Sequence, residues 1–143
     1  MVQVNSIPKK IPIFIEELVS FMVEKRKQHH QSNPDTTRLT QKGNHMCAIT
    51  HNGTPIMFGS NSFNLVRGTE HAETSALTKL INKMGRARRK ITIDMVVVRT
   101  TRGNSKPCCK CMQRIYDLSQ RFYIRYIYYT NEGIVECIKF SKC

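Results

Sequence analysis

The sequence predicts an α/β fold in which helices alternate with the strands of a five-stranded mixed sheet. Apolar residues recur at helical spacing after Pro12, and two β-type runs flank Asn52-Gly53, the dipeptide that most strongly favours a tight hairpin turn. A third run, residues 95–98, is continuously apolar, as is typical of a strand covered on both faces. With 143 residues, the chain is long enough for one domain with a buried core, so we expect a single domain over residues 1–143.

The predicted elements follow the order α-β-β-α-β-α-β-β along the chain. Helices are expected over residues 12–28, from a cap at Thr69 to residue 84, and over 108–120; strands are expected over 45–51, 55–60, 91–100, 123–129 and 134–140. Between them we expect a short N-terminal arm over 1–11, a flexible loop over the polar residues 29–44, and a turn over 60–64. About four residues separate the last two strands, too few for the crossover that parallel neighbours need, so these two strands must be antiparallel.

The chain is strongly basic. It holds 23 Lys and Arg against 10 Asp and Glu, which gives a net charge of +13 and a pI near 9.8. Basic surfaces gain affinity for polyanions by releasing counterions from phosphates, so the charge favours a nucleic acid as the partner. A net charge does not locate a patch, however, and a soluble protein whose surface is merely basic is the plainer alternative.

We expect neither a secretory signal nor a membrane span in this sequence. Its first residues lack the basic-then-apolar pattern of a secretory signal, and no stretch approaches the roughly 18 apolar residues of a membrane span. We therefore expect an intracellular protein, cytoplasmic or nuclear, without a membrane partner, whose six cysteines are thiols. Three of them fall within residues 108–111, a spacing that indicates metal chemistry more than a disulfide framework.

Two short motifs are expected at the first turns of helices: His71-Ala72-Glu73 and Pro107-Cys108-Cys109-Lys110-Cys111. Cys108 and Cys111 are three residues apart, so their sulfur atoms project from one side of a turn, where free N–H groups favour thiolates. His71 can supply a third ligand. Three protein ligands leave Zn²⁺ one open position, which is typical of catalytic sites, and Glu73 could take a proton from bound water there.

Each half of this pattern has a plainer explanation on its own. His71 could be an exposed histidine at a helix start, and Cys108 with Cys111 could form a redox pair, although the thioredoxin arrangement places its dithiol early in the chain. A structural zinc ribbon would need a second pair of cysteines with this spacing, which the sequence lacks. The two halves together favour a catalytic site, because three ligands and an acid at matched helix starts need one explanation.

In both motifs and in the predicted element order, the sequence resembles the zinc-dependent cytidine deaminase-like superfamily, and its closing hairpin resembles the branch with a C-terminal antiparallel β-hairpin. The resemblance implies a three-layer cytidine-deaminase-like fold. It implies Zn²⁺ held by His71, Cys108 and Cys111, with Glu73 as the proton shuttle in a hydrolytic attack on C4 of cytosine. It also implies substrate contacts at the backbone N–H of Ala72, at the backbone carbonyl near Ser105, and at a sugar-binding Asn, for which Asn61 is the first candidate and Asn64 the second.

The leading functional hypothesis is a zinc-dependent deaminase that converts cytosine to uracil in single-stranded DNA or RNA. Its basis is the positive charge, with cations expected near the mouth of the pocket: Arg67, Arg99, Arg102, Lys106 and Lys110. A deaminase of free cytidine, deoxycytidine or a nucleotide is the first alternative, since a nucleotide would also use such cations. A zinc-stabilised nucleic-acid-binding module without turnover is the second. Relatives with the closing hairpin often associate, so the resemblance also allows a homo-oligomer.

Four tyrosines have two possible roles: they could stack on bases, or they could lie in the core. They are at positions 123, 126, 128 and 129.

Overall fold

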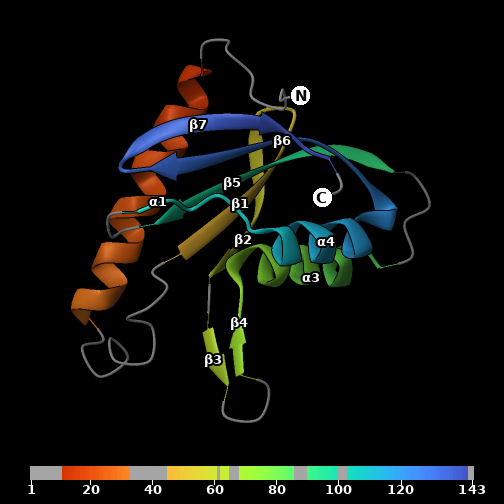
Figure 1. Ribbon diagram of the computed structural model, residues 1–143, viewed down its shortest axis with the longest axis horizontal. Helices are drawn as coiled ribbons and strands as arrows, with labels where there is room; N and C mark the ends of the chain where they lie inside the picture. The colour runs from red at the N-terminus through yellow and green to blue at the C-terminus, as the bar shows by residue number, and fades with distance from the viewer. Residues whose placement is uncertain are drawn as a thin grey trace.

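The computed structural model describes residues 11–32, 45–60, 62–64, 68–85, 90–99 and 103–141 (Figure 1). Its helices are α1 (Ile13–Ser32), α3 (Ala72–Met84) and α4 (Cys109–Leu118), followed by the short 3₁₀ turn η2 (Ser119–Arg121). Its strands are β1 (His45–His51), β2 (Thr54–Ser60), β3 (Ser62–Asn64), β4 (Gly68–Glu70), β5 (Ile91–Arg99), β6 (Phe122–Asn131) and β7 (Ile134–Lys139). Residues 1–10 of the expected arm and residues 33–44 of the expected loop lie outside the described residues.

Five strands form one mixed sheet in the order β2-β1-β5-β6-β7. β5 and β6 are parallel, and the other neighbours are antiparallel, including β6 with β7. The predicted five-stranded mixed sheet and its antiparallel last pair are therefore confirmed. Because β5 and β6 are parallel, their carboxyl ends lie at the same edge of the sheet, and the segment that leads into α4 starts from this edge.

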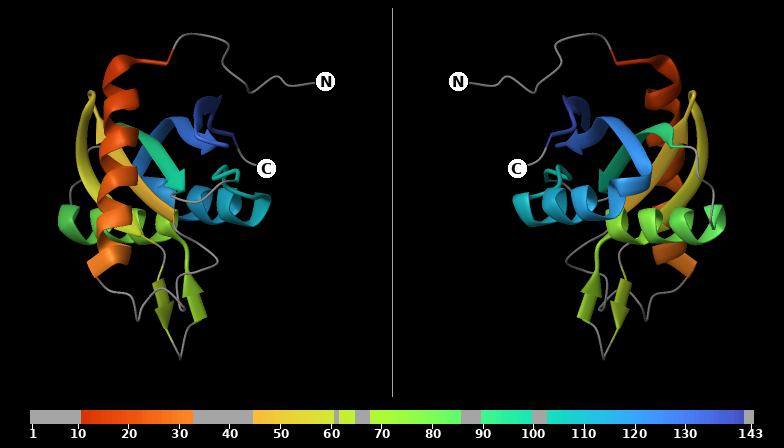
Figure 2. Two further views of the ribbon diagram at one scale, coloured as in Figure 1. Left: turned by 90° about the vertical axis from the view of Figure 1, so that its left-hand side faces the viewer. Right: turned by 90° about the vertical axis from the view of Figure 1, so that its right-hand side faces the viewer.

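Helices cover both faces of this sheet, so the molecule has three layers. α1 packs on one face, and α3 and α4 lie side by side on the other, as Figures 1 and 2 show. Each face has its own buried core, and β5 contributes to both, with Val96 and Val98 on the α1 side and Met95 and Val97 on the other. The expectation of a strand covered on both faces is confirmed for β5.

Two tight turns have the backbone that their sequences favour. Asn52 and Gly53, between β1 and β2, have φ of 51° and 79°, as a two-residue type I′ hairpin requires. Glu132 and Gly133, between β6 and β7, repeat this pattern with φ of 51° and 82°. Both hairpins therefore close where the sequence predicts them.

Three local expectations are wrong. Residues 29–32, expected in a loop, are the last residues of α1. Residues 62–64, expected in a turn, form β3, which pairs with β4 in a separate two-stranded sheet. Thr69 does not cap α3, because it lies in β4 opposite Phe63, and the N-cap is His71. Pairing with β3 holds residues 68–70 in extended form, so the helix can begin only after them.

α3 lies very close to β2 at Gly59. A Cβ atom at this position would come within 2.4 Å of the backbone nitrogen of Ala76 and 2.7 Å of the carbonyl oxygen of Ala72. Both alanines are fully buried. Small residues on the strand and on the helix therefore set the depth at which the N-terminal half of α3 packs.

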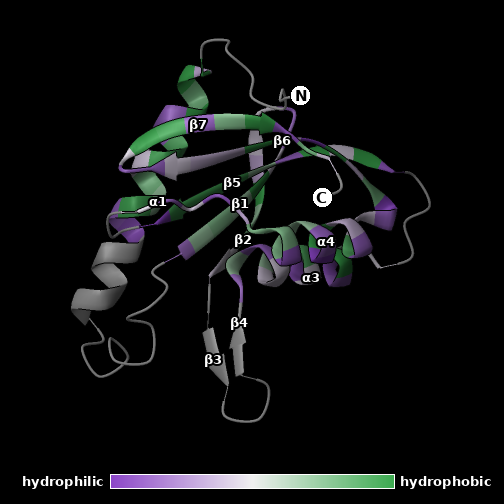
Figure 3. Ribbon diagram, viewed as in Figure 1, coloured by the Kyte–Doolittle hydropathy of each residue, from purple (hydrophilic) through white to green (hydrophobic). Residues whose placement is uncertain are grey.

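Hydrophilic and hydrophobic residues alternate around α3 and α4 (Figure 3), as expected for helices that cover a sheet with one face. The large apolar side chains that are exposed lie on several elements, among them Phe21 on α1, Tyr123 on β6 and Ile134 on β7. Among the described residues, none of the helices combines the length and the hydrophobicity that a membrane crossing requires.

Candidate metal centre and active site

The first motif lies at the start of α3. His71 is the N-cap residue, with an extended backbone (φ −78°, ψ 148°) and an exposed side chain. Glu73 lies in the first turn and is buried, with 5% of its surface exposed. In mid-helix, residues two apart point to different sides; the extended backbone at His71 releases this pair from that constraint.

The second motif lies at the start of α4. Cys108 is the N-cap residue, with φ −74° and ψ 173°, and its side chain makes no capping hydrogen bond. The carbonyl of Cys108 accepts the first helical hydrogen bond, from the N–H of Met112 at 2.8 Å. Cys111 follows in the first turn and is half-buried. Both cysteines therefore lie at a helix N-terminus, where unpaired N–H groups favour a thiolate.

The two helix starts bring the three predicted ligands into contact. Nδ1 of His71 lies 3.4 Å from Sγ of Cys111, and Sγ of Cys111 lies 3.5 Å from Sγ of Cys108. With ordinary zinc bond lengths and a tetrahedral geometry, two ligand atoms are about 3.6 Å apart for N and S and about 3.8 Å apart for two S. Both contacts are thus close to the edges of a zinc-ligand tetrahedron. Figure 1 shows the N-terminal ends of α3 and α4 on the same side of the molecule.

The donor set also suits zinc. One imidazole nitrogen and two cysteine sulfurs are donors that Zn²⁺ binds tetrahedrally, and three of them leave a fourth position open. Within the described residues, no group of three or more His, Cys, Asp or Glu side chains is already arranged as a complete set of metal ligands. Two edges of the ligand triangle, His71–Cys111 and Cys111–Cys108, thus differ from zinc-site distances by only a few tenths of an ångström.

Burial and hydrogen bonding shift the acidities at this site. Burial raises the pKa of the Glu73 carboxyl. The backbone N–H of Cys111 lowers the pKa of the Cys108 thiol, as is usual for a sulfur at a helix N-terminus. Partial burial, followed by the nearby Glu73 charge, raises the pKa of Cys111 to about 12. Since the charge of Glu73 acts on Cys111 and the charge of His71 acts on Glu73, the carboxylate lies near the ligand cluster.

The segment that leads into α4 is fixed by a buried serine. Oγ of Ser105 lies 2.8 Å from the carbonyl oxygen of Val97 and 2.8 Å from the backbone nitrogen of Thr130. The sequence drew attention to Ser105 only for its backbone carbonyl, through the family resemblance. No pattern in the sequence indicated the role of its hydroxyl or of Thr130, because 25 residues separate the two in the chain.

The other predicted site residues are distributed unevenly. Lys106 and Lys110 are exposed, and Ala72 is buried at the first position of α3. The guanidinium of Arg99 lies against Gly103, where a Cβ atom would come within 2.8 Å of Nη1. Only the backbone of Asn64, in β3, is described, and three further predicted residues lie outside the described ranges: Asn61, Arg67 and Arg102.

The cysteines and tyrosines outside the motifs divide as follows. Four cysteines are free thiols: Cys47 and Cys137, which are buried, and the predicted ligands Cys108 and Cys111. Cys109 is disulfide-bonded, so the expectation of six thiols is wrong. Tyr128 and Tyr129 are buried, which supports the core alternative for them. Tyr123 is 59% exposed, and Lys90 lies over its ring at 5.1 Å.

The chain is similar to known deaminases in sequence and in fold. A family model described as "Cytidine and deoxycytidylate deaminase zinc-binding region" matches residues 21–127. Among solved structures, a cytidine deaminase from Burkholderia pseudomallei is similar, with a TM-score of 0.51 and 24% identity over 66% of this chain and 73% of that chain. A dCMP deaminase from the cyanophage S-TIM5 matches with a TM-score of 0.39 and 17% identity over 78% of this chain and 87% of that one. A search of the curated proteins finds no match.

The Burkholderia structure confirms the cytidine-deaminase-like fold. The matched family region spans both motifs, and its description names zinc, so Zn²⁺ is the cofactor of this region. From the family match over residues 21–127, we conclude that the chain belongs to the zinc-binding cytidine and deoxycytidylate deaminase family.

Proposed function

We propose that this deaminase hydrolyses the amino group of cytosine to give uracil, and that its substrate is cytosine within a single-stranded nucleic acid. One observation carries the catalytic part of the proposal. Glu73 is buried at the same helix start as His71, and its charge acts on Cys111, so an acid accompanies the cluster of one imidazole and two thiols at the N-termini of α3 and α4. A pure binding site would have no need of an acid at this position.

In this proposal His71, Cys108 and Cys111 hold the zinc ion. When bound there, Zn²⁺ would lower the pKa of a coordinated water and so supply a nucleophile at neutral pH. Two thiolates cancel the formal charge of the ion, so a protein base is needed as well. Glu73 takes a proton from the attacking water and delivers it to N3 of cytosine. It then carries the proton of the new hydroxyl on C4 to the amino nitrogen, which leaves as ammonia while C4 becomes a carbonyl.

Backbone groups near both motifs orient the base in this proposal. Ala72 is the first helical residue of α3, so its N–H has no partner within the helix and is suited to the base carbonyl. The carbonyl near Ser105 would accept a hydrogen bond from the exocyclic amine. Asn61, with Asn64 as the second candidate, remains the prediction for the sugar contact.

Exposed cations beside the site favour a polymeric substrate. Lys106 lies two residues before Cys108, Lys110 lies between Cys108 and Cys111, and Arg114 follows four residues after Lys110, about one turn further along α4. All three side chains are exposed, and none of them has an ion-pair partner among the described residues. Such a row can hold successive phosphates of a strand whose base enters the site. In a single strand, unstacking a base costs little free energy.

A deamination assay on the zinc-loaded protein tests this function. Free cytidine, deoxycytidine and their monophosphates would be compared with single-stranded DNA and RNA at low and moderate salt. Conversion within the polymers that fades as salt rises is the expected result. Salt-tolerant conversion of a monomer alone would support the alternative, a nucleoside or nucleotide deaminase.

Glu73→Ala separates an enzyme from a zinc-stabilised binding module. The variant should lose turnover by a factor of about 10² to 10⁴ while it keeps zinc and affinity for the strand, because general acid–base catalysis is all that it removes. Glu17→Ala, at an exposed position on α1, is the matched control. A wild-type protein that binds the strand without converting it would identify the binding module.

Arg114→Glu tests the row of cations directly. We expect weaker binding of a cytosine-containing single strand and a salt dependence whose slope falls by about 0.7, the value for one lost phosphate contact. Lys139→Glu makes the same charge change on β7, where the side chain is also exposed, and should leave both unchanged. If the two variants lose equal affinity for the strand, the loss reflects the net charge of the protein and not a contact made by Arg114.

A further inference from the structure

At the carboxyl ends of β5 and β6, a serine hydroxyl forms hydrogen bonds to both strands. In a parallel pair, the carbonyl of one strand normally accepts from an N–H of its neighbour. The last paired residues here are Val97 and Tyr129. The Val97 carbonyl and the N–H of Thr130, the residue after Tyr129, both bond to Oγ of Ser105, each at 2.8 Å. Ser105 therefore bridges the two strands where they end.

The hydrogen atoms of this cluster allow one complete pattern. The Ser105 hydroxyl donates to the Val97 carbonyl and accepts from the Thr130 N–H, while the Ser105 N–H donates to the Thr130 carbonyl at 2.8 Å. The Thr130 hydroxyl accepts from the Arg99 N–H at 3.2 Å and lies 3.1 Å from the Ser105 hydroxyl, to which it can donate. Ser105 and Thr130 are 2% and 3% exposed, so water cannot easily replace these bonds.

The residues before Ser105 are tied to the β6–β7 turn. The N–H of Glu132 donates to the carbonyl of Gly103 at 3.1 Å, and Asn104 forms an isolated antiparallel bridge with Asn131. The Asn104 side chain in turn accepts from the N–H of Lys106 at 2.8 Å. Residues 103–106 are thus held against one strand end at several points.

This fixed segment leads directly to the metal ligands. Only two residues, Lys106 and the buried Pro107, stand between Ser105 and Cys108. The proline ring restricts φ, which leaves this short connection little freedom. A shift of Ser105 would therefore be passed on to Cys108, and through the first turn of α4 to Cys111.

We infer that Ser105 is a positioning residue for the metal centre: its buried hydroxyl, held by Val97 and Thr130, fixes where the chain delivers Cys108 and Cys111 to His71. This inference rests on the proposed zinc site. The bonds of the hydroxyl go to Val97 and Thr130, and none of them goes to the ligand cysteines or His71, so it acts only through the segment that it anchors.

The zinc affinity of variants tests this role, measured by competition with a chromophoric chelator alongside the thermal midpoint of the metal-free protein. Ser105→Ala should raise the dissociation constant for zinc by about 10-fold. This is the lower end of the range for groups that orient metal ligands without binding the metal themselves. Ser105→Thr keeps a hydroxyl and should restore most of the affinity. Thr130→Val, which removes only the second hydroxyl of the cluster, should weaken zinc binding by less than Ser105→Ala.

Two controls separate positioning from stability. Ser119→Ala removes a hydroxyl at the other end of α4, where it bonds to the Tyr116 carbonyl, and should leave zinc affinity unchanged. Ile138→Val makes a small cavity in the core under β7. It therefore lowers stability without changing any contact of residues 103–106. If Ser105→Ala lowers the thermal midpoint but leaves zinc affinity unchanged, or if Ile138→Val weakens zinc binding equally at the same stability loss, the inference is overturned. If the wild-type protein binds no zinc, the proposed function itself fails.

Discussion

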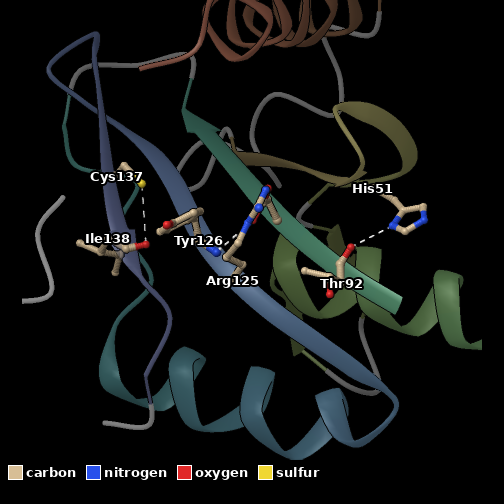
Figure 4. A network of polar contacts seen from close by, with 7 residues as sticks. His51, Thr92, Arg125, Tyr126, Cys137 and Ile138 are labelled. Carbon is tan, nitrogen blue, oxygen red and sulfur yellow. Dashed lines mark hydrogen bonds and ion pairs between the residues drawn. The ribbon is translucent and has the colours of Figure 1, made fainter. Parts of the chain in front are cut away.

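At the scale of single residues, Asp94 shows how a charged group is accommodated in the middle of a buried strand. The register of β5 against β6 shifts here, so that Asp94 alone faces Arg125 and Tyr126. Its carboxylate accepts hydrogen bonds from the Tyr126 N–H at 3.0 Å and from Nε and Nη2 of Arg125 at 3.2 and 2.8 Å. Figure 4 shows Arg125 and Tyr126 next to each other on β6. The buried carboxylate thus satisfies the backbone group that the bulge leaves free.

Replacing Asp94 with Asn should therefore destabilise the fold. The amide can still accept from Tyr126, but it loses the paired, charge-assisted bonds to Arg125, which we expect to cost about 2 kcal/mol of unfolding free energy. Urea unfolding measures this. Asp117→Asn, at an exposed position with one hydrogen bond from Gln113, is the control and should cost far less. Equal losses would show that the bulge does not depend on the charge.

At the scale of elements, the placement of α3 depends on its close approach to β2. The backbone of Ala72 and Ala76 occupies the space that a side chain at Gly59 would need. Since neither backbone can move without shifting the whole helix, Gly59 controls the position of the helix start that carries His71 and Glu73.

Gly59→Ala should accordingly affect both stability and the site. We expect a loss of about 3 kcal/mol, at the upper end of overpacking costs, together with weaker zinc binding because the start of α3 is displaced. Ser60→Ala, at the next position of β2, is the control and should change neither quantity appreciably. Chemical unfolding and chelator competition give the two readouts, and a variant as stable as the wild type would contradict the packing described here.

Sequence patterns predicted the long elements and both motifs, because these depend on local periodicity and on spacings within one turn. Three-residue strands such as β3 and β4 have no such periodicity, and only their pairing reveals them. For the same reason the start of α3 was placed at Thr69 instead of His71. The hydroxyl cluster of Ser105 and Thr130 could not be predicted either, since nothing local marks which of many serines and threonines become buried partners across 25 residues.

At the scale of the whole molecule, the proposed zinc site joins two helices that are far apart in the sequence. His71 belongs to α3 and the cysteines to α4, and β5 lies between them in the chain. An ion that binds this assembly and not the unfolded chain stabilises the folded state by mass action.

Removal of zinc should therefore lower the thermal midpoint. At a free zinc concentration of about 1,000 times the dissociation constant, the stabilisation is about 4 kcal/mol, or roughly 14 °C for a chain of this size. Calorimetry with and without a chelator measures the difference, and Cys108→Ser should abolish it. Identical midpoints for zinc-loaded and chelated wild type would contradict the assignment of the ligands.

The meeting of two helix N-termini also affects the rates at which the protein folds and unfolds. The donors lie on two helices that meet through their packing on the sheet, so we expect the ion to find its ligands late in folding. Interactions that are absent from the transition state slow unfolding and leave the rate of folding nearly unchanged. Bound zinc would thus lengthen the lifetime of the native protein without helping it to form.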